Sequence, residues 1–454
     1  MAKYQAYVEY KDSGVEWLGK IPSHWLATQV KYGYLVTLGK MLQSTPKSSL
    51  DELKLYLKAQ NIQPNGINID QVESMWFSPD ECKKLLLQKS DVLVSEGGDA
   101  GRSAIWNCEL EECYIQNAIN RVRPKYVNNS KYFLYWMKFL KSTDFINIIC
   151  NKATIAHYTA EKLEGSPIFL PSSDEQIAIA NFLDHETAKI DHLIEKQQQL
   201  IELLKEKRQA VISHAVTKGL DPNVPMKDSG VEWLGEVPEH WNMAPVRRYL
   251  VEHRQGYYTT ESYVDEGLKL LRITDLRDLG EINISNCPMV NESDTTHLFK
   301  LQKGDVVFAR TGGAGSFGVI TEDYENLIYA SYLIRFRFMN KIFEPDYLRF
   351  LFQSDSFQLS VKQNIHGGVN QNIHAEDIKN TVICAPSLSE QKEIIEYLEN
   401  QCLLFENLIY KASYSVKLMQ ERRTALISSA VTGKIDVRNW QAPTLAEAKT
   451  ELSA

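Results

Sequence analysis

The sequence predicts an α+β fold in which two homologous mixed α/β globules are each followed by one long helix. Three observations predict it: a fifteen-residue motif that occurs twice, long helical segments at the same offset, and short strand patterns between them. KDSGVEWLGKIPSHW ends at Trp25 and KDSGVEWLGEVPEHW ends at Trp241, 216 residues later, with twelve of fifteen positions identical. A period of this length is far longer than a solenoid unit, so it predicts a duplicated pair of domains.

The helical segments follow each globule at the same offset. Each begins with Pro-Ser and places a Glu three residues after the Ser, as in Ser172 with Glu175 and Ser387 with Glu390, which predicts a capping box. Apolar residues recur every seven positions, which predicts coiled-coil helices roughly 60 Å long. One seam comprises Leu183, Ile190, Leu204 and Val211, with Gln197 as the polar exception, and Leu398, Phe405, Ala412, Met419 and Leu426; a second seam comprises Leu193, Leu200 and Leu408.

A helix of this length with an apolar stripe needs a partner, and each helix can pair with its own copy. We expect antiparallel pairing, which would put the globules at opposite ends of the pair and relate them by a pseudo-twofold axis. Parallel pairing would require residues 242–385 to serve as a return connection of roughly 60 Å, although they read as a compact domain.

The chain is expected to divide into seven parts. They are a lead-in at 1–25, a first globule at 26–170, a spacer helix at 171–220, a linker with the second lead-in at 221–241, a second globule at 242–385, a second spacer helix at 386–435 and a flexible tail at 436–454. The globules have diverged, but YLKAQNI aligns with LLRITDL, DVLVSEGGDAG with DVVFARTGGAG, and NRVR with IRFR. The β-branched, alternating character of DVLVS, DVVFA and LIRFRF predicts strands. We expect Trp17, Trp25, Trp233 and Trp241 to anchor the lead-ins on the helix ends.

The composition is that of an ordinary globular protein, with 44% hydrophobic residues and a net charge of −8. No run of eighteen apolar residues occurs, so we expect no membrane span, and the first fourteen residues carry no apolar signal core. The seven cysteines form no CxxC pair and predict buried thiols in a reducing cytoplasm. The first globule has 17 Lys and Arg against 15 Asp and Glu, and the second has 15 against 18. This balance argues against a nucleic-acid binder, which typically has a basic domain.

The lead-in W-L-G-x-[IV]-P-x-H-W and the helix opening P-S-x-x-E-Q both occur twice and in order. This arrangement resembles the specificity subunit of Type I restriction–modification enzymes, over about Lys11 to Asp436. The resemblance implies two target recognition domains joined by two helical spacers. Each domain would recognise one half of a bipartite, asymmetric DNA site, and the spacers would set the gap. Globules at most roughly 60 Å apart suit two major-groove contacts separated by one or two helical turns of about 34–36 Å each.

The resemblance also implies a non-catalytic, cytoplasmic subunit that binds double-stranded DNA. Its expected partners are two methyltransferase subunits, which modify adenine N6, and two restriction subunits, which act as translocase and nuclease. S-adenosylmethionine, ATP and Mg would belong to those partners, and no cofactor or metal is expected in this chain. The sequence agrees in lacking an NPPY motif and a GxxxxGK[ST] loop. The alternative is a coiled-coil scaffold that joins two protein-interaction domains and does not bind DNA.

Base contacts favour Arg or Lys for guanine, Asn or Gln for adenine, and Ser or Thr for either. Three regions of each globule have this composition: the segment after the first aligned strand, the Gly-rich turn, and the stretch before the long helix. In the first globule they supply Lys58, Gln60, Asn61, Arg102, Ser103, Lys152, Thr154, His157, Tyr158 and Thr159. In the second they supply Arg272, Thr274, Arg310, Thr311, Ser316, Asn364, His366, Asn370, Gln371, Asn372 and His374.

Some of these features admit two interpretations. The GGDAG and GGAG segments either face DNA or are tight turns between strands. Arg121 and Arg123, like Arg335 and Arg337, alternate along strands, and each pair either faces phosphates or is solvated. A lone histidine such as His157 is more often structural. Because neither globule is basic, we expect the chain alone to bind DNA weakly, with the methyltransferase partners supplying much of the positive charge around the DNA.

Overall fold

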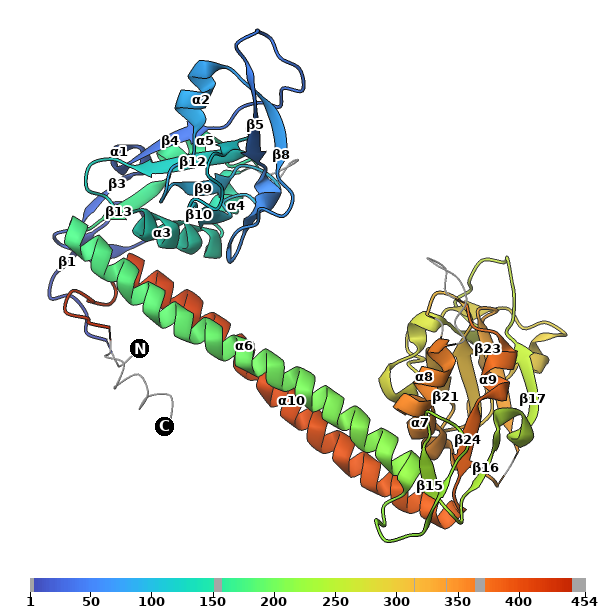
Figure 1. Cartoon of the computed structure of the whole chain (residues 1–454). Helices are drawn as coiled ribbons and strands as arrows, with labels where there is room; N and C mark the ends of the chain where they lie inside the picture. The colour runs from blue at the N-terminus through green and yellow to red at the C-terminus, as the bar shows by residue number, and fades with distance from the viewer. Residues whose placement is uncertain (1–3, 151–156, 314, 340, 364–371, 443–454) are drawn as a thin grey trace. The chain divides into compact units, whose positions relative to one another are not determined.

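The computed structural model describes residues 4–150, 157–313, 315–339, 341–363 and 372–442. It divides into two compact units: unit 1 contains residues 1–196 and 415–454, and unit 2 contains residues 197–414. Each unit holds one globule and a part of both long helices, which are α6 (Ser173–Lys218) and α10 (Leu388–Val431) (Figure 1).

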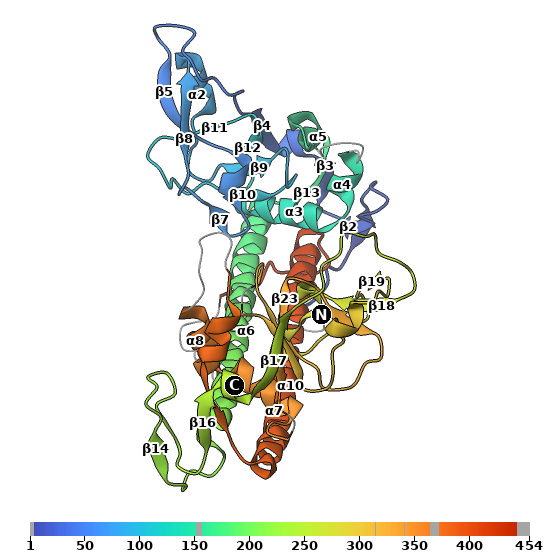
Figure 2. The ribbon, with the colours of Figure 1, turned by 90° about the vertical axis from the view of Figure 1, so that its right-hand side faces the viewer.

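The first globule is built from short strands in two larger sheets and two two-stranded sheets. The strands are β3 (Leu26–Gln29), β4 (Tyr34–Leu38), β5 (Glu52–Leu57), β6 (Ile62–Gln63), β7 (Gly66–Ile67), β8 (Glu73–Phe77), β9 (Val92–Ser95), β10 (Ser103–Ile105), β11 (Tyr114–Ile115), β12 (Ile119–Pro124) and β13 (Pro167–Leu170). An antiparallel sheet has the order β10-β9-β12-β4, and a second sheet has the order β11-β5-β8, with β11 parallel to β5. Helix α2 (Pro79–Leu85) packs on the second sheet (Figure 2), where Leu85 is buried with Tyr56 and Phe77.

The second globule repeats this topology. Its strands are β16 (Asn242–Pro245), β17 (Leu250–Gln255), β18 (Leu268–Leu271), β19 (Met289–Val290), β20 (Asp305–Ala309), β21 (Phe317–Val319), β22 (Leu327–Tyr329), β23 (Leu333–Phe338) and β24 (Val382–Ala385). The antiparallel sheet has the order β21-β20-β23-β17, and the second has the order β22-β18-β19, with β22 parallel to β18. Strand order and direction match those of the first globule, so the predicted duplication and the predicted strands are confirmed.

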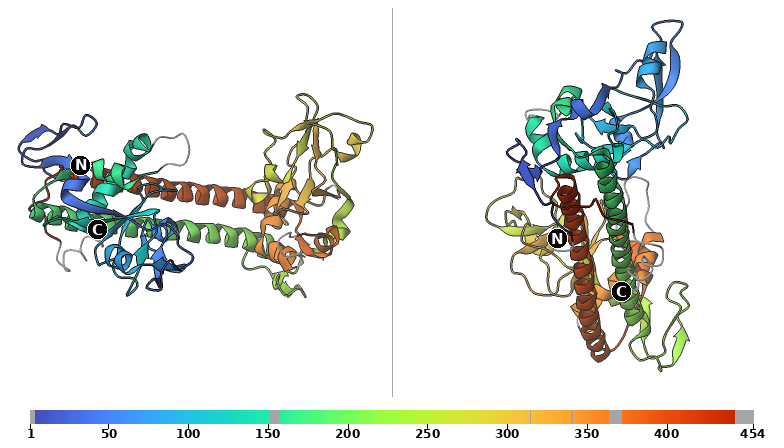
Figure 3. Two further views of the ribbon diagram at one scale, coloured as in Figure 1. Left: turned by 90° about the horizontal axis from the view of Figure 1, so that it is seen from above. Right: turned by 90° about the vertical axis from the view of Figure 1, so that its left-hand side faces the viewer.

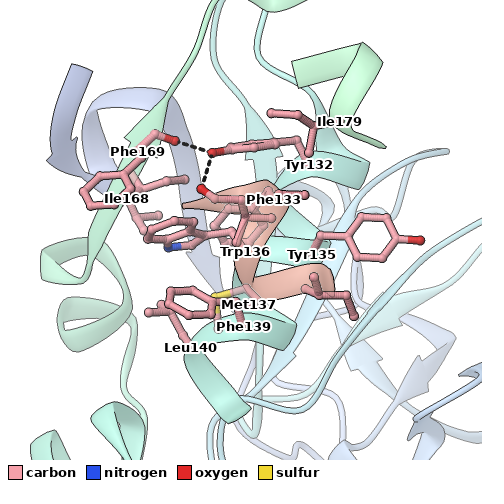
Figure 4. Packing of buried hydrophobic residues seen from close by; sticks show 14 of the residues in the cluster. Tyr132, Phe133, Tyr135, Trp136, Met137, Phe139, Leu140, Ile168, Phe169 and Ile179 are labelled. Atoms are coloured by element: carbon pink, nitrogen blue, oxygen red, sulfur yellow. Dashed lines mark hydrogen bonds between the residues drawn. The ribbon is translucent and has the colours of Figure 1, made fainter. Parts of the chain in front are cut away.

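Helices cover the antiparallel sheets. They are α1 (Val30–Gly33), α3 (Ser130–Ser142), α4 (Phe145–Ile149) and α5 (Ala160–Gly165) in the first globule, and α7 (Pro345–Gln353), α8 (Asp355–Gln363) and α9 (Ala375–Asn380) in the second. Figure 4 shows the core that α3 forms with β13 and the start of α6. The Tyr132 hydroxyl lies 2.7 Å from the carbonyl oxygen of Phe169 and 3.4 Å from that of Val431. In unit 2 the Tyr347 hydroxyl lies 3.4 Å from the carbonyl oxygen of Val216. In each unit, therefore, a buried tyrosine joins the globule to the end of a long helix.

The first and last strands of each globule pair with each other. β3 runs antiparallel to β13, with Leu26 opposite Leu170, and β16 runs antiparallel to β24, with Asn242 opposite Ala385. Each globule therefore closes on itself: the chain leaves it next to the point at which it entered. This geometry lets a globule vary without moving the lead-in or the helix that flank it.

The long helices run antiparallel within each unit (Figures 1 and 3). In unit 1 Asp191 of α6 accepts hydrogen bonds of 2.7 and 3.2 Å from Arg423 of α10. Nearer the start of α6, Leu183 is buried with Ala430, so the position along α10 rises as the position along α6 falls. In unit 2 the C-terminal turns of α6 are buried with the N-terminal turns of α10. The predicted antiparallel pairing is confirmed within both units.

The heptad prediction is correct for one seam and wrong for the other. Leu183, Ile190, Leu398, Phe405 and Ala412 are buried, and Leu204, Val211, Met419 and Leu426 are half-buried. The second seam faces solvent: Leu193, Leu200 and Leu408 are 49%, 42% and 39% exposed. The second contact position on α6 lies one residue later than predicted: Thr187, Ile194 and Ile201 are buried or half-buried, so the neighbouring Leu193 and Leu200 turn outward.

The repeated lead-in ends at a buried junction. The Trp25 indole donates a hydrogen bond of 3.0 Å from Nε1 to the carboxylate of Glu175, and Trp241 donates one of 2.9 Å to Glu390. Both indoles are almost fully buried. Gly433, just past the end of α10, lies so close to Trp25 that a β-carbon would meet its Cη2 at 3.2 Å. In each unit the tryptophan therefore anchors the lead-in at the start of one long helix, as predicted, and Trp25 also packs against the end of the other.

The capping boxes form only in part. The Ser172 hydroxyl accepts from the Glu175 backbone nitrogen at 3.4 Å, and Ser387 accepts from Glu390 at 3.3 Å. The two carboxylates, which a capping box would turn back on the helix, bind the lead-in instead. Besides the indole, Glu175 accepts a hydrogen bond of 2.6 Å from the Tyr7 hydroxyl and lies 3.0 Å from His24 Nε2, and Glu390 lies 3.1 Å from His240 Nε2. Glutamate at this position thus serves a tertiary contact, because the neighbouring tryptophan offers a buried N–H that needs an acceptor.

The glutamine after each glutamate fixes the globule's first long helix. Gln176 accepts a hydrogen bond of 2.9 Å from the Asn129 backbone nitrogen, at the start of α3. Gln391 accepts one of 2.9 Å from the Glu344 nitrogen, at the start of α7. The repeated Glu-Gln pair therefore couples each long helix both to the lead-in and to the globule.

The other two tryptophans are only partly buried: Trp17 and Trp233 are 44% and 37% exposed, so neither is a buried anchor like Trp25 and Trp241. Trp17 instead stacks on Phe139 and Phe145, with ring centroids 6.3 and 5.0 Å apart.

Five of the seven cysteines are buried, as predicted, whereas Cys82 is half-buried and Cys108 is exposed. Burial raises the pKa of the Cys113 and Cys384 thiols to about 12, which makes them poor nucleophiles. Among the described residues, no helix combines the length and apolarity required to span a bilayer.

Replacing Trp25 by Phe should lower the free energy of unfolding by about 1–3 kcal/mol, because the buried Glu175 carboxylate loses one of its donors and keeps only Tyr7 and His24. Trp241→Phe should cost less, because the Glu390 side chain is 24% exposed and that of Glu175 only 3%. Urea denaturation of both variants measures the difference. An equal or reversed order would contradict the proposed role of the Glu175 carboxylate.

Candidate nucleic-acid interface

Three segments that are distant in sequence meet at one edge of the first globule. They are the 3₁₀ turn η1 (Ala59–Asn61), the Gly-rich turn between β9 and β10, and the residues before α5. Arg102 donates a hydrogen bond of 3.1 Å to the Ala59 carbonyl, which ties the Gly-rich turn to η1. The Tyr158 nitrogen donates one of 2.7 Å to the Glu96 carbonyl, which ties the third segment to the same turn.

The corresponding segments meet in the second globule. The Ile373 nitrogen donates a hydrogen bond of 3.0 Å to the Arg310 carbonyl, and Thr311 forms a β-bridge with Asn372. A β-carbon on Gly313 would lie 3.4 Å from Cγ2 of Ile273, which belongs to the 3₁₀ turn η3 (Ile273–Asp275). The three regions that the sequence analysis selected separately are therefore contiguous in both globules.

Both Gly-rich segments connect the strands of a hairpin, so the tight-turn interpretation is confirmed. Gly98 and Gly101 have φ of +70° and +78°, and Gly312 and Gly315 have φ of +73° and +91°, a region that favours glycine. A β-carbon at Gly101 would also lie 2.4 Å from Cδ1 of Ile146. Whether these turns face DNA stays a prediction.

The predicted contact residues differ in exposure. Gln60, His157, Thr274, Ser316 and His374 are exposed. Lys58, Arg102, Thr159, Arg272, Arg310, Thr311 and Asn372 are partly exposed. Asn61, Ser103 and Tyr158 are buried. Lys152, Thr154, Asn364, His366, Asn370 and Gln371 lie outside the described residues.

The buried residues have structural roles. The Asn61 side chain accepts from the Lys58 nitrogen at 2.8 Å and donates to the carbonyls of Asn68 and Gln71 at 2.9 and 3.1 Å. The Tyr158 hydroxyl lies 2.7 Å from that of Ser166. Their polar groups are already used within the protein, so we assign no DNA contact to Asn61, Tyr158 or the buried Ser103. The sequence could not reveal this, because asparagine suits base contacts and tight turns equally well.

Two predicted basic contacts are paired with carboxylates. Lys58 forms an ion pair with Glu73. Arg272 donates two hydrogen bonds of 3.1 Å to Asp275, and these bonds raise the pKa of the guanidinium. Each basic side chain is held beside a carboxylate, so the ion pair as a whole carries no net charge.

The strand arginines match neither interpretation offered by the sequence. Arg121 and Arg335 are 3% and 1% exposed, so they are neither solvated nor available to phosphates. Arg121 donates to the backbone carbonyls of Lys84 and Leu86 at 2.9 and 3.0 Å. Arg121 and Arg335 therefore hold neighbouring backbone segments against the sheet. The alternation of residues along a strand cannot distinguish this buried role from exposure at the surface.

Their neighbours form buried ion pairs that repeat between the globules. Arg123 donates to the two carboxylate oxygens of Asp91 at 2.6 and 2.7 Å. Arg337 does the same to Asp305, with both bonds at 2.7 Å, and these bonds raise the pKa of its guanidinium. Each aspartate begins the strand that leads into the Gly-rich turn, so the pair fixes the base of the candidate interface.

Glu96 is a residue that the sequence analysis missed. It opens the Gly-rich turn of the first globule and aligns with Arg310 of the second. One of its carboxylate oxygens is buried and has no hydrogen-bond partner among the described residues. Burial raises the pKa of this carboxyl, while His157 and Lys162 partly offset the shift. The sequence did contain a signal: an acidic residue, Glu96, aligns with a basic one, Arg310, so the two interfaces differ in charge at this position.

Within the described part of the chain, no three His, Cys, Asp or Glu side chains gather where they could hold a metal ion. The candidate interface is instead a surface of hydrogen-bonding side chains around a fixed turn, present once in each globule.

Each of the two homologous globules thus carries one such edge. The family model described as the Type I restriction modification DNA specificity domain matches residues 38–203 and 269–407. These ranges include most of both globules and more than half of the chain. The chain therefore belongs to the Type I restriction–modification specificity-subunit family, a non-catalytic family, and the resemblance seen in the sequence is confirmed.

Similar proteins agree with this assignment. The EcoKI specificity subunit of Escherichia coli K12 is 24% identical over 445 residues, which are 93% of this chain and 92% of that protein. The EcoBI specificity subunit of Escherichia coli is 24% identical over 364 residues, 78% of this chain and 75% of that protein. The HsdS subunit from Thermoanaerobacter tengcongensis has the same fold, with a TM-score of 0.52 at 14% identity over 91% of this chain and 98% of its own. A chain from a Type I restriction–modification complex gives a TM-score of 0.69 at 13% identity, over 91% of this chain and 99% of its own.

Replacing Asp305 by Ala should lower the free energy of unfolding by about 3 kcal/mol, because Arg337 loses its buried partner. The control is Asp294→Ala, an exposed aspartate of the same globule, which should cost at most about 0.5 kcal/mol. Urea denaturation distinguishes them. A cost below about 1 kcal/mol for Asp305→Ala would contradict the structural role of this pair.

Replacing Glu96 by Gln should stabilise the protein as the pH rises. The pKa of Glu96 is raised on folding, so its contribution to stability is present below the unfolded value of about 4.3 and is lost as the pH rises through the folded value. Relative to wild type, the variant should be about equal at pH 4 and more stable by up to about 0.5 kcal/mol at pH 7, a modest gain because solvent screens the site. Urea denaturation at both pH values measures this. A variant less stable at pH 7 than at pH 4, relative to wild type, would contradict the burial argument.

Proposed function

We propose that each globule recognises one half of a bipartite, gapped DNA site. The observation that carries the proposal is the repeated edge, where a 3₁₀ turn, a Gly-rich turn and a third segment meet in both globules. The backbone elements of this edge are the same in both globules, whereas their exposed side chains differ. Two domains that recognise different half-sites would require this combination. The resulting subunit gives its complex sequence specificity and carries out no catalysis itself.

Exposed and partly exposed side chains on this edge have the chemistry of base and phosphate contacts. In the first globule Arg102 and Gln60 suit guanine and adenine, and the Glu96 carboxylate suits the cytosine amino group. In the second, Arg310 stands where the first has Glu96, and Thr311 lies beside Asn372. A glutamate in one globule and an arginine at the aligned position of the other support a preference for different nucleobases. The DNA-contact set proposed here excludes the buried Asn61, Ser103 and Tyr158.

The charge balance supports a shared DNA interface. With 17 basic against 15 acidic residues in one globule and 15 against 18 in the other, this chain neutralises few phosphates by itself. Partner subunits would then supply much of the electrostatic affinity, and this chain the sequence preference. Isolated, it should bind DNA weakly and with a shallow salt dependence.

The outward stripe of α10 supports docking of a methyltransferase subunit. Leu403, Tyr410 and Tyr414 are 60%, 70% and 50% exposed and fall on one face at helical spacing. Tyr410 and Tyr414 stack with their ring centroids 6.4 Å apart. An exposed apolar stripe of this kind is typical of a helix that packs against a partner. In this proposal two methyltransferase subunits bring S-adenosylmethionine, two restriction subunits bring ATP and Mg, and the helical pair sets the gap between half-sites.

The test is to map methylated adenines across host DNA by single-molecule sequencing, with and without this gene. Loss of one gapped, two-part motif with the gene is the expected result and gives both half-sites. If every motif persists in a host that expresses the whole system, the alternative of a scaffold that does not bind DNA takes the place of this proposal.

Variants on one globule should change one half of the motif only. Replacing Arg102 and Gln60 by Ala should weaken discrimination at the first half-site by roughly 10- to 100-fold, since each good base contact contributes about 1–3 kcal/mol. Replacing Thr274 and Thr311 by Ala should affect only the other half. The methylation map of each variant measures the change.

The matched control is Lys131→Ala, which removes a basic residue of the first globule that pairs with Asp184 on α6. Its motif should be unchanged. A uniform loss across both halves in the Arg102 and Gln60 variant, or an unaltered motif, would count against recognition by separate globules.

A further inference from the structure

The two copies of KDSGVEWLG fold into the same hairpin. The first joins β1 (Tyr10–Asp12) to β2 (Lys20–Pro22), and the second joins β14 (Met226–Asp228) to β15 (Glu236–Pro238). The register is the same, with each aspartate opposite the residue that follows the last glycine of the motif. The tips can therefore be compared residue by residue.

Most of the repeated letters are explained by the hairpin itself. The aspartate accepts from the backbone nitrogen of the first glycine, at 2.8 Å in Asp12 and 2.9 Å in Asp228. The serine hydroxyl accepts from the valine nitrogen at 3.1 Å in both copies. All four glycines of the two tips have φ between +60° and +74°, and the leucine of each copy is buried. Lys227 donates to two backbone carbonyls, at 2.6 and 2.8 Å.

The neighbouring letters Glu16-Trp17 and Glu232-Trp233 are left over, and the Lys11 side chain, unlike that of Lys227, has no hydrogen bond or ion pair with a described residue. Neither glutamate has a hydrogen bond or ion pair with any described residue, and both are exposed. The tryptophans are 44% and 37% exposed. Trp17 stacks on two phenylalanines, but within the described chain no aromatic ring stacks on Trp233, so packing does not account for a tryptophan in both places.

We propose that this exposed Glu-Trp pair is a docking contact that binds the same protein at both hairpins, one copy to each. The globules around the hairpins have diverged, so an identical solvent-facing pair is best explained by an identical partner. The inference rests on the proposed function, in which the component present in two equal copies is the methyltransferase subunit. It adds a contact distinct from the apolar stripe on α10.

The chemistry of the pair indicates what the partner presents. A carboxylate beside an exposed indole suits a guanidinium or ammonium group, which can pair with the glutamate and lie over the ring. The same carboxylate would repel DNA phosphates. The hairpin tips are therefore protein-binding surfaces that accept a basic side chain.

The test uses the full chain co-expressed with the methyltransferase subunit of the same system and purified through a tag on this chain. Native mass spectrometry counts the bound subunits, and a titration gives their affinity. Wild type should carry two. Glu16→Arg and Glu232→Arg should each weaken one site by at least tenfold and leave one subunit bound, and the double variant should retain neither.

Matched controls are Glu111→Arg and Glu325→Arg, which make the same charge change at exposed glutamates of the two globules. They should still carry two subunits. Trp233→Ala, which removes no stacked ring, should weaken one site as Glu232→Arg does, and thermal melting checks that each variant is folded.

A folded double variant that binds two subunits with less than a twofold change in affinity would overturn the docking contact and leave the proposed function intact. Weakening by the two controls equal to that by the hairpin variants would also overturn it, because charge alone would then be the cause. If the wild-type chain captures no methyltransferase subunit, the proposed function fails and this inference fails with it.

Discussion

The architecture depends on one buried contact made twice: a tryptophan indole that donates to a glutamate in the first turn of a long helix. In unit 1 Trp25 lies against Glu175 and against Gly433 at the end of α10. In unit 2 Trp241 lies against Glu390 and against Gly219 at the end of α6. A buried carboxylate and a buried indole each need a partner, so their mutual hydrogen bond stabilises the one place where lead-in, helix start and helix end meet. The rest of each globule is built outward from that point, and its first and last strands pair so that it starts and finishes there.

In this arrangement the buried interactions repeat between the globules, whereas the side chains on the candidate interface can differ. The Arg–Asp pair at the base of the Gly-rich turn is present in both globules with nearly the same geometry, and so is the hydrogen-bonded 3₁₀ turn beside it. On the edge that these elements support, Glu96 of one globule is replaced by Arg310 in the other. A change of charge there alters what the edge binds without disturbing the buried pairs beneath it. Recognition can thus diverge on a scaffold whose core interactions are fixed.

Much of the fold could be predicted from the sequence, because duplication made its signals visible twice. Strand alternation in DVLVS and DVVFA and the heptad seam through Leu183 and Leu398 follow from periodicities of 2 and 3.5. The second seam was misplaced by one residue, because Leu193 and Ile194, like Leu200 and Ile201, are adjacent apolar residues and the sequence does not say which of the two faces the partner helix. Polar residues posed the same difficulty at the candidate interface. Asn61 and Arg121 are residue types that often contact DNA, yet both side chains donate hydrogen bonds to backbone carbonyls within the protein. Only the tertiary structure distinguishes these two roles. Glu96 lies outside the predicted set because acidic side chains were not among the residue types taken to favour base contacts, although a carboxylate can accept a hydrogen bond from the cytosine amino group.

The central claim is that each globule is an interchangeable reader on a common frame. The most direct test is a chimera in which residues 242–385 are replaced by residues 26–170, expressed with its partner subunits, followed by mapping of methylated adenines. The pairing of first and last strands in both globules should allow the exchange to fold. The account predicts a gapped motif in which both halves are the half-site of the first globule. A motif that retains the original second half-site, or a folded and assembled chimera that directs methylation to no gapped motif, would contradict it.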